Sequence, residues 1–175
     1  MESPGILRTA STLMPASPAP PVRVSVVITT YNWPQALQRA LAALTRQWTL
    51  PHEVIVADDG SHDDTRTLIE TIACDYPVPL RHSWIEDRGF RVALARNRAI
   101  AASRGDYVLL LDGDMLAHPG FVADHLHAAQ RGSFVQGMRV LTDTEGSARL
   151  LSGEKAALGF FDRGLSRRRH TLRIP

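Results

Sequence analysis

The 175-residue sequence contains one cysteine and one lysine, and its other scarcities narrow the class of protein further. The single cysteine, Cys74, excludes an intramolecular disulfide and a zinc site built from several cysteines, and we interpret it as a small buried hydrophobe. No apolar run approaches the roughly 20 residues that span a bilayer, and the N-terminus lacks the apolar stretch of a signal peptide. With 44% hydrophobic and 22% charged residues, the composition predicts a soluble, cytoplasmic globular domain.

Basic residues are concentrated at the C-terminal end. Five of the 20 fall within residues 163–175, where there is no acid, so residues 1–162 carry 15 basic and 18 acidic side chains. A general nucleic-acid binder needs positive charge spread over a face, together with aromatic side chains for stacking. The sequence therefore predicts no nucleic-acid partner. The basic tail is either a solvated end or a peripheral contact to anionic lipid or a glycolipid at the inner face of a membrane.

Residue patterns divide the chain into three parts. Residues 1–22 hold five of the 11 prolines without helical or strand periodicity, which predicts a disordered Pro/Ser-rich leader. From 23 to 141, strand and helix patterns alternate with short connections, which predicts a mostly parallel α/β sheet with helices on both faces. The patterns fade in residues 142–175, where we expect an incomplete segment ending in the basic tail.

The apolar spacing locates individual elements. Strands are expected at 22–29, 53–57, 80–84, 107–111 and 133–141, and helices from 34, from about 64, and at 92–103, 121–130 and 148–158. The first helix should have Asn32 as its cap and Pro34 in its first turn, and the second a capping box formed by Ser61 and Asp64. The run Tyr107 to Leu111 is wholly apolar, which is typical of a strand buried on both faces.

Polar residues follow three of the expected strands where each strand ends. These residues are Thr29 to Asn32, Asp58 to Ser61 and Asp112 to Asp114. Ligands of open α/β sheets bind beyond the carboxyl ends of the strands, so four aspartates are expected at one rim. A divalent cation with oxygen ligands, completed by diphosphate oxygens, would neutralise their mutual repulsion.

Each of these pieces also has a plain structural interpretation. Asp-Gly sequences form common turns, and Asp58 to Ser61 fits a strand-to-helix turn. His118, His125 and His127 have weak metal-ligand spacing and are interpreted as residues on a helix surface. The combination of the motifs is more specific than any one of them.

Four stretches between residues 24 and 121 form an ordered set of motifs. They are Val24-Ser-Val-Val-Ile-Thr-Thr-Tyr-Asn32, Val54-Ile-Val-Ala-Asp-Asp-Gly-Ser61, Arg88-Gly-Phe-Arg-Val-Ala-Leu-Ala-Arg-Asn-Arg98, and Gly105-Asp-Tyr-Val-Leu-Leu-Leu-Asp-Gly-Asp-Met115 with His118-Pro-Gly-Phe121. This set resembles the donor-binding half of family 2 glycosyltransferases of the GT-A fold, in particular chondroitin-polymerase-like and galactosyltransferase-like members. The resemblance covers about residues 23–140.

The resemblance implies a nucleotide-sugar-binding GT-A domain at 23–141 and roles for its residues. Thr29 and Tyr31 would line the nucleotide pocket, and Asp59 would accept the N3–H of a uracil ring. Arg91 would contact the diphosphate.

Four further residues have roles implied by the same resemblance. Arg96 and Asn97 would help to hold the donor. Asp112 would approach the ribose or a metal-bound water, and Asp114 would ligate Mn²⁺ or Mg²⁺.

The implied reaction is metal-dependent, inverting transfer of a sugar from a nucleotide-diphosphate sugar, above all a UDP-sugar, to a saccharide or glycolipid hydroxyl. A metal and an arginine would stabilise the leaving diphosphate, and an acidic base would deprotonate the acceptor. The acidic pair that supplies this base in the family has no counterpart after Leu141, so no base is assigned. The late carboxylates are Asp143, Glu145, Glu154 and Asp162.

Two other functions stay open at the level of sequence. The chain can be a truncated, catalytically incomplete nucleotide-binding module, because no acceptor half is recognisable. An apolar strand ending in Asp-x-Asp also occurs in aspartyl-phosphate phosphohydrolases, where Asp112 would be the nucleophile and Asp114 the acid/base. That class needs a downstream lysine, and Lys155 is the sole candidate.

Overall fold

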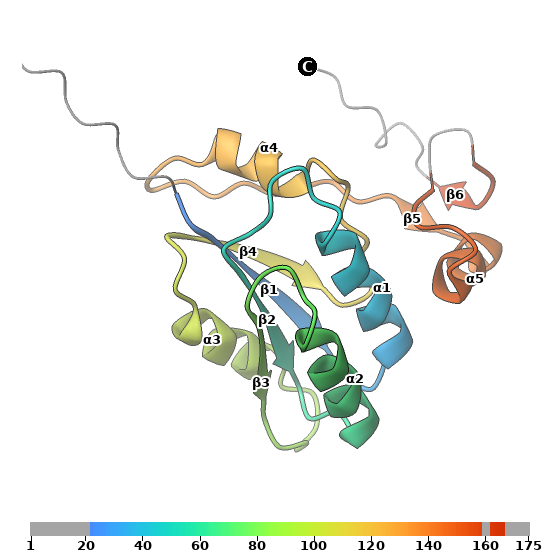
Figure 1. Cartoon of the computed structure of the whole chain (residues 1–175), viewed down its shortest axis with the longest axis horizontal. Helices are drawn as coiled ribbons and strands as arrows, with labels where there is room; N and C mark the ends of the chain where they lie inside the picture. Colours follow the sequence, from blue (N-terminus) through green and yellow to red (C-terminus); the bar gives the residue numbers. More distant parts are fainter. Residues whose placement is uncertain (1–21, 159–161, 167–175) are drawn as a thin grey trace, which may run out of the picture.

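A four-stranded parallel sheet forms the centre of the computed structural model, which describes residues 22–158 and 162–166 (Figure 1). Its strands, in the spatial order β3-β2-β1-β4, are β1 (Val24–Thr30), β2 (Glu53–Asp58), β3 (Leu80–Trp84) and β4 (Tyr107–Asp112). β1 and β2 occupy the middle and are buried along their whole length, which explains their β-branched and apolar sequences. The expected parallel α/β sheet is confirmed.

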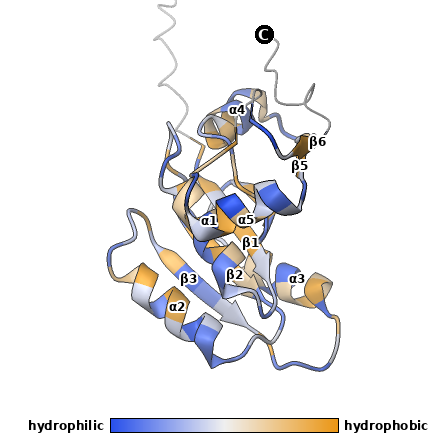
Figure 2. Ribbon diagram, turned by 90° about the vertical axis from the view of Figure 1, so that its right-hand side faces the viewer, coloured by the Kyte–Doolittle hydropathy of each residue, from blue (hydrophilic) through white to orange (hydrophobic). Residues whose placement is uncertain are grey.

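Helices cover both faces of this sheet, as expected. One face carries α1 (Pro34–Leu44), α2 (Asp63–Ala73) and α4 (Phe121–Ala128), whose apolar sides form one core with the strands. The opposite face carries α3 (Val92–Ala102), where Ala95 and Ala99 bring the helix against Val27 and Ile55. Figure 2 shows α2 and α3 on opposite sides of the strands. Among the described residues, no helix is long and apolar enough to cross a membrane.

A smaller unit follows the sheet and lies beside α1 (Figure 1). It consists of α5 (Thr144–Ser152) between two short antiparallel strands, β5 (Leu141–Thr142) and β6 (Leu165–Ser166). Asp143 begins the helix by accepting a hydrogen bond from the amide of Gly146 at 2.8 Å, and Gly153 ends it in a left-handed conformation. The expected leader, apart from Val22, and the tail arginines at 167–169 and 173 lie outside the described residues.

Two expected strands differ in the structure. Residues 131–140 form no regular element, so the strand expected at 133–141 is wrong, and only Leu141 enters β5. The apolar run in β4 is not buried on both faces, because β4 is at the edge of the described sheet and Leu110 is 50% exposed.

The burial of two single residues also differs from the expectation. Cys74 is exposed, whereas we expected it to be buried, and His125 is buried, whereas we expected it at the surface.

The helix expected from 148 begins at Thr144, but the starts expected at 92 and 121 are confirmed, as is the place of Pro34 in the first turn of α1. The residue before it, Trp33, is the cap and contributes no side-chain hydrogen bond. The Ser61–Asp64 capping box is also wrong, because α2 begins after His62 without a side-chain cap. Asn32 and Ser61 bond elsewhere, at the rim of the sheet.

A buried carboxylate fixes the opposite, amino-terminal edge of the sheet. Glu53, 2% exposed, accepts hydrogen bonds from Ser25 Oγ at 2.7 Å, from the Arg104 amide at 2.6 Å and from Arg81 Nη1 at 3.1 Å. Burial by itself would raise the pKa of Glu53, but these donors outweigh it and hold the pKa below its ordinary value of 4.5. Glu53 therefore ties β1, β3 and the loop after α3 to the start of β2.

We expect Glu53→Gln to lower the free energy of unfolding by about 2 kcal/mol. The amide NH₂ of glutamine would face groups that donate hydrogen bonds to the carboxylate, and it cannot accept a hydrogen bond. Because the folded pKa is depressed, the contribution of Glu53 is complete above its ordinary pKa and is lost as the pH falls through the folded value. In urea unfolding measured from pH 7 to pH 3, the free energy of unfolding should fall less steeply with decreasing pH in the variant than in the wild type. The exposed Glu70→Gln is the control and should match the wild type; equal acid slopes for the wild type and Glu53→Gln would contradict this role.

Candidate functional site

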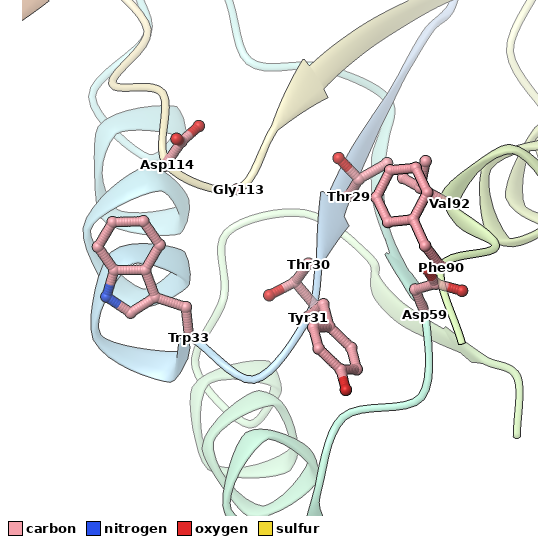
Figure 3. Close-up of a pocket in the computed structure, with 9 residues that line it drawn as sticks. All are labelled: Thr29, Thr30, Tyr31, Trp33, Asp59, Phe90, Val92, Gly113 and Asp114. Atoms are coloured by element: carbon pink, nitrogen blue, oxygen red, sulfur yellow. The ribbon is translucent and has the colours of Figure 1, made fainter. Parts of the chain in front are cut away.

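The carboxyl ends of β1, β2 and β4 meet at one rim of the sheet. Thr29 of β1 is in register with Ala57 of β2 and with Asp112 of β4, so the residues after each strand lie side by side. They surround a pocket of about 210 Å³, here called the rim pocket (Figure 3). The pocket is lined by Thr29, Thr30, Tyr31, Trp33, Asp59, Phe90, Val92, Gly113 and Asp114.

A close backbone contact shapes the rim between β1 and β4. A Cβ atom at Gly113 would lie 2.4 Å from the carbonyl oxygen of Thr29, far inside van der Waals contact. Only glycine fits this position, and the turn it permits places Asp114 in the lining of the pocket. The tight turn expected at Gly113 is thus accounted for by the approach of a neighbouring strand.

The loops after β1 and β2 are joined by two reciprocal hydrogen bonds. The Asn32 amide donates to Ser61 Oγ, and the His62 amide donates to Asn32 Oδ1, both at 2.9 Å. Asn32 has a φ of 46°, a left-handed conformation that asparagine tolerates better than most residues. Its side chain serves the start of α2 instead of α1, a long-range contact that short-range cap patterns do not reveal.

Asp59 presents an unpaired acceptor in the rim pocket. The residue is 3% exposed, and its Oδ2 accepts a hydrogen bond from the Arg91 amide at 2.8 Å. Its Oδ1 is buried and finds no hydrogen-bond partner among the described residues. An unsatisfied buried acceptor costs about 1–3 kcal/mol, so a ligand that supplies a donor at this point gains a strong contact.

The neighbouring carboxylate, Asp58, belongs to the fold instead of the pocket. Its Oδ1 accepts the amides of Gly60 and Ser61, and its Oδ2 lies 2.8 Å from Nε2 of His82. Burial favours a raised pKa for Asp58, but the hydrogen bonds from His82 and Ser61 prevail and lower it. Asp58 is at the expected rim, in register with Thr30, but partners inside the protein already satisfy it and it does not line the rim pocket.

Asp112 and Arg96 form an ion pair beside the pocket. Asp112 Oδ1 lies 3.2 Å from Arg96 Nη2 and accepts a hydrogen bond from Thr29 Oγ1 at 3.2 Å. The Asp112 side chain is 49% exposed, so its other oxygen is accessible. Arg96 thus orients Asp112.

The two other residues expected to contact the donor are placed as follows. Asn97, on the same helix as Arg96, is exposed. The Arg91 guanidinium donates to the carbonyl of Glu86.

The structure therefore separates the expected site residues into two groups. Thr29, Tyr31, Asp59 and Asp114 line the rim pocket together. Four others, which are Arg91, Arg96, Asn97 and Asp112, are not among its lining residues. Their roles toward a ligand stay predictions from sequence. Trp33 and Phe90 also line the pocket, although the sequence assigned no role to either; Phe90 belongs to the Arg88–Arg98 motif, and Trp33 directly follows the first motif.

Three of the four carboxylates after β5 make contacts within the fold. Asp143 caps α5, Glu154 pairs with Arg149 at 3.1 Å, and Asp162 pairs with Lys155. Lys155 pairs with Asp162 and Asp112 pairs with Arg96, so among the described residues the lysine that a phosphohydrolase needs forms no ion pair with Asp112. In residues 22–158 and 162–166, no group of three His, Cys, Asp or Glu residues is arranged to hold a metal ion.

Comparison with known proteins identifies the family. The profile of glycosyl transferase family 2 matches residues 25–173. The chain belongs to glycosyl transferase family 2. The resemblance inferred from the motifs is confirmed, and the family match also extends over the segment after Leu141 in which the motifs were not recognisable.

Named relatives of this family 2 member are much longer than the chain. It is 40% identical over 119 residues to validoxylamine A glucosyltransferase from Streptomyces hygroscopicus subsp. limoneus, a match that covers 66% of this chain and 25% of the relative. It is 36% identical over 106 residues to hyaluronan synthase from Pasteurella multocida, covering 60% of this chain and 11% of the relative. The chain thus spans a quarter or less of the length of these two relatives.

Solved structures agree with the fold of this family 2 domain. A crystal structure of TarS from S. aureus has a TM-score of 0.52 and 26% identity, covering 60% of this chain and 19% of that one. The parallel sheet with helices on both faces is thereby confirmed as the GT-A type of α/β fold, of which this chain covers a part.

We expect Asn32→Ala to lower the free energy of unfolding by about 1–2 kcal/mol, because it removes the hydrogen bond to the His62 amide and puts alanine at a positive φ. Asn32→Gly removes the side-chain bond but relieves the backbone strain, so it should cost less. Urea unfolding and amide hydrogen exchange at His62 measure the two effects. Unchanged exchange at His62 in both variants would show that the two loops are not joined in this way.

Proposed function

We propose that the rim pocket binds the nucleoside diphosphate part of a sugar donor, above all a UDP-sugar. The observation that carries this proposal is the buried Oδ1 of Asp59, which has no partner among the described residues and belongs to the pocket lining. The N3–H of uracil is a donor that fits such an acceptor, and cytosine presents a lone pair at the same position. Asp59 would therefore select uracil by both attraction and repulsion.

The names of similar proteins support this choice of donor. A solved structure of S. aureus TarS contains UDP-GlcNAc and matches this chain with a TM-score of 0.50 and 26% identity. The relatives include a glucosyltransferase and a hyaluronan synthase, whose names specify sugar transfer and polysaccharide synthesis. We extend to this chain the shared chemistry, which is transfer of a sugar to a hydroxyl of a saccharide or glycolipid, with inversion as the family resemblance implies.

Asp114 and Asp112 would hold Mn²⁺ or Mg²⁺ together with the diphosphate. In the part of the chain that the structure describes, no protein group pairs with the Asp114 carboxylate, which lines the pocket and is exposed. Asp112 keeps one oxygen outside its contacts with Thr29 and Arg96. Mg²⁺ commonly binds one or two carboxylates plus substrate phosphates and waters, so this donor set fits. The ion would act as a Lewis acid on the diphosphate.

Protein groups would complete the environment of the leaving diphosphate. The backbone amide of Arg91 is bonded to Asp59, so Arg91 is held beside the rim pocket. Its buried Nε has no partner in the described ranges, which leaves a donor for a phosphate oxygen. Acceptor activation requires a carboxylate on the face opposite the diphosphate. Asp143, Glu154 and Asp162 are engaged in fold contacts, so we assign none of them as the base.

The same observation favours a second candidate function, a nucleotide-binding module without turnover. Donor binding draws on the rim pocket alone, whereas transfer also needs the base. Measuring donor affinity and sugar-transfer rate on one sample distinguishes the two functions: binding with transfer indicates the enzyme, and binding without transfer indicates the module.

We expect the full chain to bind UDP more tightly than CDP, and Asp59→Asn to lose about tenfold or more in UDP affinity, since a hydrogen bond to a charged group is worth about 1.5–3 kcal/mol. The asparagine should also narrow the ratio of UDP to CDP affinity. Isothermal titration calorimetry with both nucleotides measures this. Asp75→Asn, an exposed aspartate in the loop before β3 at the other end of the sheet, is the matched control. Equal affinities of the wild type for UDP and CDP would disprove the role of Asp59.

For the metal, we expect Mn²⁺ or Mg²⁺ to increase UDP affinity in the wild type and in Asp75→Asn but not in Asp114→Asn. Without metal, the affinity of Asp114→Asn should equal or exceed that of the wild type, because a negative charge near the diphosphate has been removed. The measurement is a UDP titration with and without the ion. A metal-dependent gain of the same size in Asp114→Asn would place the ion elsewhere.

A further inference from the structure

A second pocket adjoins the rim pocket on the side away from Asp59. This side pocket, of about 130 Å³, is lined by Trp33, Ala36, Arg39, Asp114, Leu116, Thr142, Ser147, Leu150 and Leu151. Trp33 and Asp114 belong to both pockets, and Figure 3 shows them together at the edge of the rim pocket opposite Asp59 and Phe90. A donor with its base at Asp59 and its diphosphate at Asp114 would therefore have its sugar end next to the side pocket.

The lining of the side pocket combines groups that suit a hydroxylated ring. The Trp33 side chain is 46% exposed, and an aromatic surface can pack against the apolar face of a sugar. Thr142 Oγ1 and Ser147 Oγ lie 2.6 Å apart and form a hydroxyl pair. One of the two protons is used between them, so the pair can donate one hydrogen bond and accept others.

Arg39 adds a positive charge to this lining. Its Nε donates to the carbonyl oxygen of Leu151 at 3.1 Å, which fixes the side chain between α1 and α5. Neither terminal nitrogen is bonded to any residue within the described ranges, and no ion pair there includes Arg39. A guanidinium held by Nε presents its remaining N–H groups as a fork for a carboxylate or a phosphate.

Resting on the proposed function, we infer that the side pocket binds the acceptor, and that the acceptor is a hydroxylated ring carrying a carboxylate or phosphate that pairs with Arg39. Trp33 packs against the ring, and the hydroxyl pair of Thr142 and Ser147 bonds to it. The reacting hydroxyl then lies on the Asp114 side, where the donor sugar ends.

Arg46 allows a purely structural role of Arg39 to be distinguished from a role in binding. Arg46, two residues after the end of α1, donates from Nη2 to the carbonyl oxygen of Ala156 at 3.3 Å. It therefore joins the residues that follow α1 to the residues that follow α5, and it lines neither pocket. Arg46→Gln removes such a fastening without touching the side pocket, which makes it the matched control for Arg39→Gln. Arg39→Lys keeps the charge and loses the fork.

The test is a nuclear magnetic resonance titration of the full ¹⁵N-labelled chain, first with UDP and Mg²⁺ and then with four probes. The probes are methyl glucuronoside, glucose 6-phosphate, methyl glucoside and inorganic phosphate. We expect either the glucuronoside or the sugar phosphate to shift the Trp33 indole and the Thr142 and Ser147 amides, at concentrations about tenfold lower than methyl glucoside requires. Which of the two anionic sugars binds more tightly identifies the acid group of the acceptor.

The variants separate recognition from fastening. We expect Arg39→Gln to remove the advantage of the anionic sugar, Arg39→Lys to keep part of it, and Arg46→Gln to keep all of it. Three results would overturn the inference: UDP shifts at the rim pocket with no sugar shifts at the side pocket, equal responses to neutral and anionic sugars, or equal losses in Arg39→Gln and Arg46→Gln. A strong response to inorganic phosphate alone would mean a simple anion site. Absence of UDP shifts at Thr29, Asp59 and Gly113 is a different result, because it removes the proposed function itself.

Discussion

The candidate site depends on how closely the end of β4 approaches the end of β1. Gly113 passes so near to the Thr29 carbonyl that no side chain fits between the two backbones. This contact fixes the Asp112–Asp114 turn against β1, so that Asp112 meets Thr29 and Asp114 reaches the pocket. The positions of Asp112 and Asp114 at the rim therefore follow from a steric constraint on Gly113.

Two adjacent aspartates show how environment assigns different tasks to one residue type. Asp58 is enclosed by the amides of its own turn and by His82, which satisfy both of its oxygens. Asp59 is equally buried but has only the Arg91 amide, so one oxygen is left for a ligand. Two neighbouring carboxylates at the end of β2 therefore differ in their partners: Asp58 is satisfied within the fold, and Asp59 keeps one oxygen for the proposed ligand.

Sequence patterns predicted the parts of this molecule that short-range physics determines. The β-branched runs of β1 and β2 and the apolar spacing of α1 located the sheet and its helices, because burial in the middle of a parallel sheet leaves few alternatives. The motifs likewise located Asp59 and Asp114. Contacts between distant segments were not predictable: the bonds between Asn32, Ser61 and His62 replaced the expected caps, and His82 satisfies one oxygen of Asp58. Residues 131–140 have strand-like composition but form no strand, since composition does not supply a neighbouring strand to pair with.

Two arginine bonds, from Arg39 in α1 to Leu151 in α5 and from Arg46 after α1 to Ala156 after α5, affect the relative rigidity of the site. The rim pocket is built on the fully buried central strands, whereas the far wall of the side pocket is held through Arg39 and Arg46 to two backbone carbonyls. Few contacts of this kind mean a low free energy of local opening. The molecule thus combines a stiff half and a compliant half within one cleft, and thermal fluctuation will widen the cleft from the α5 side first.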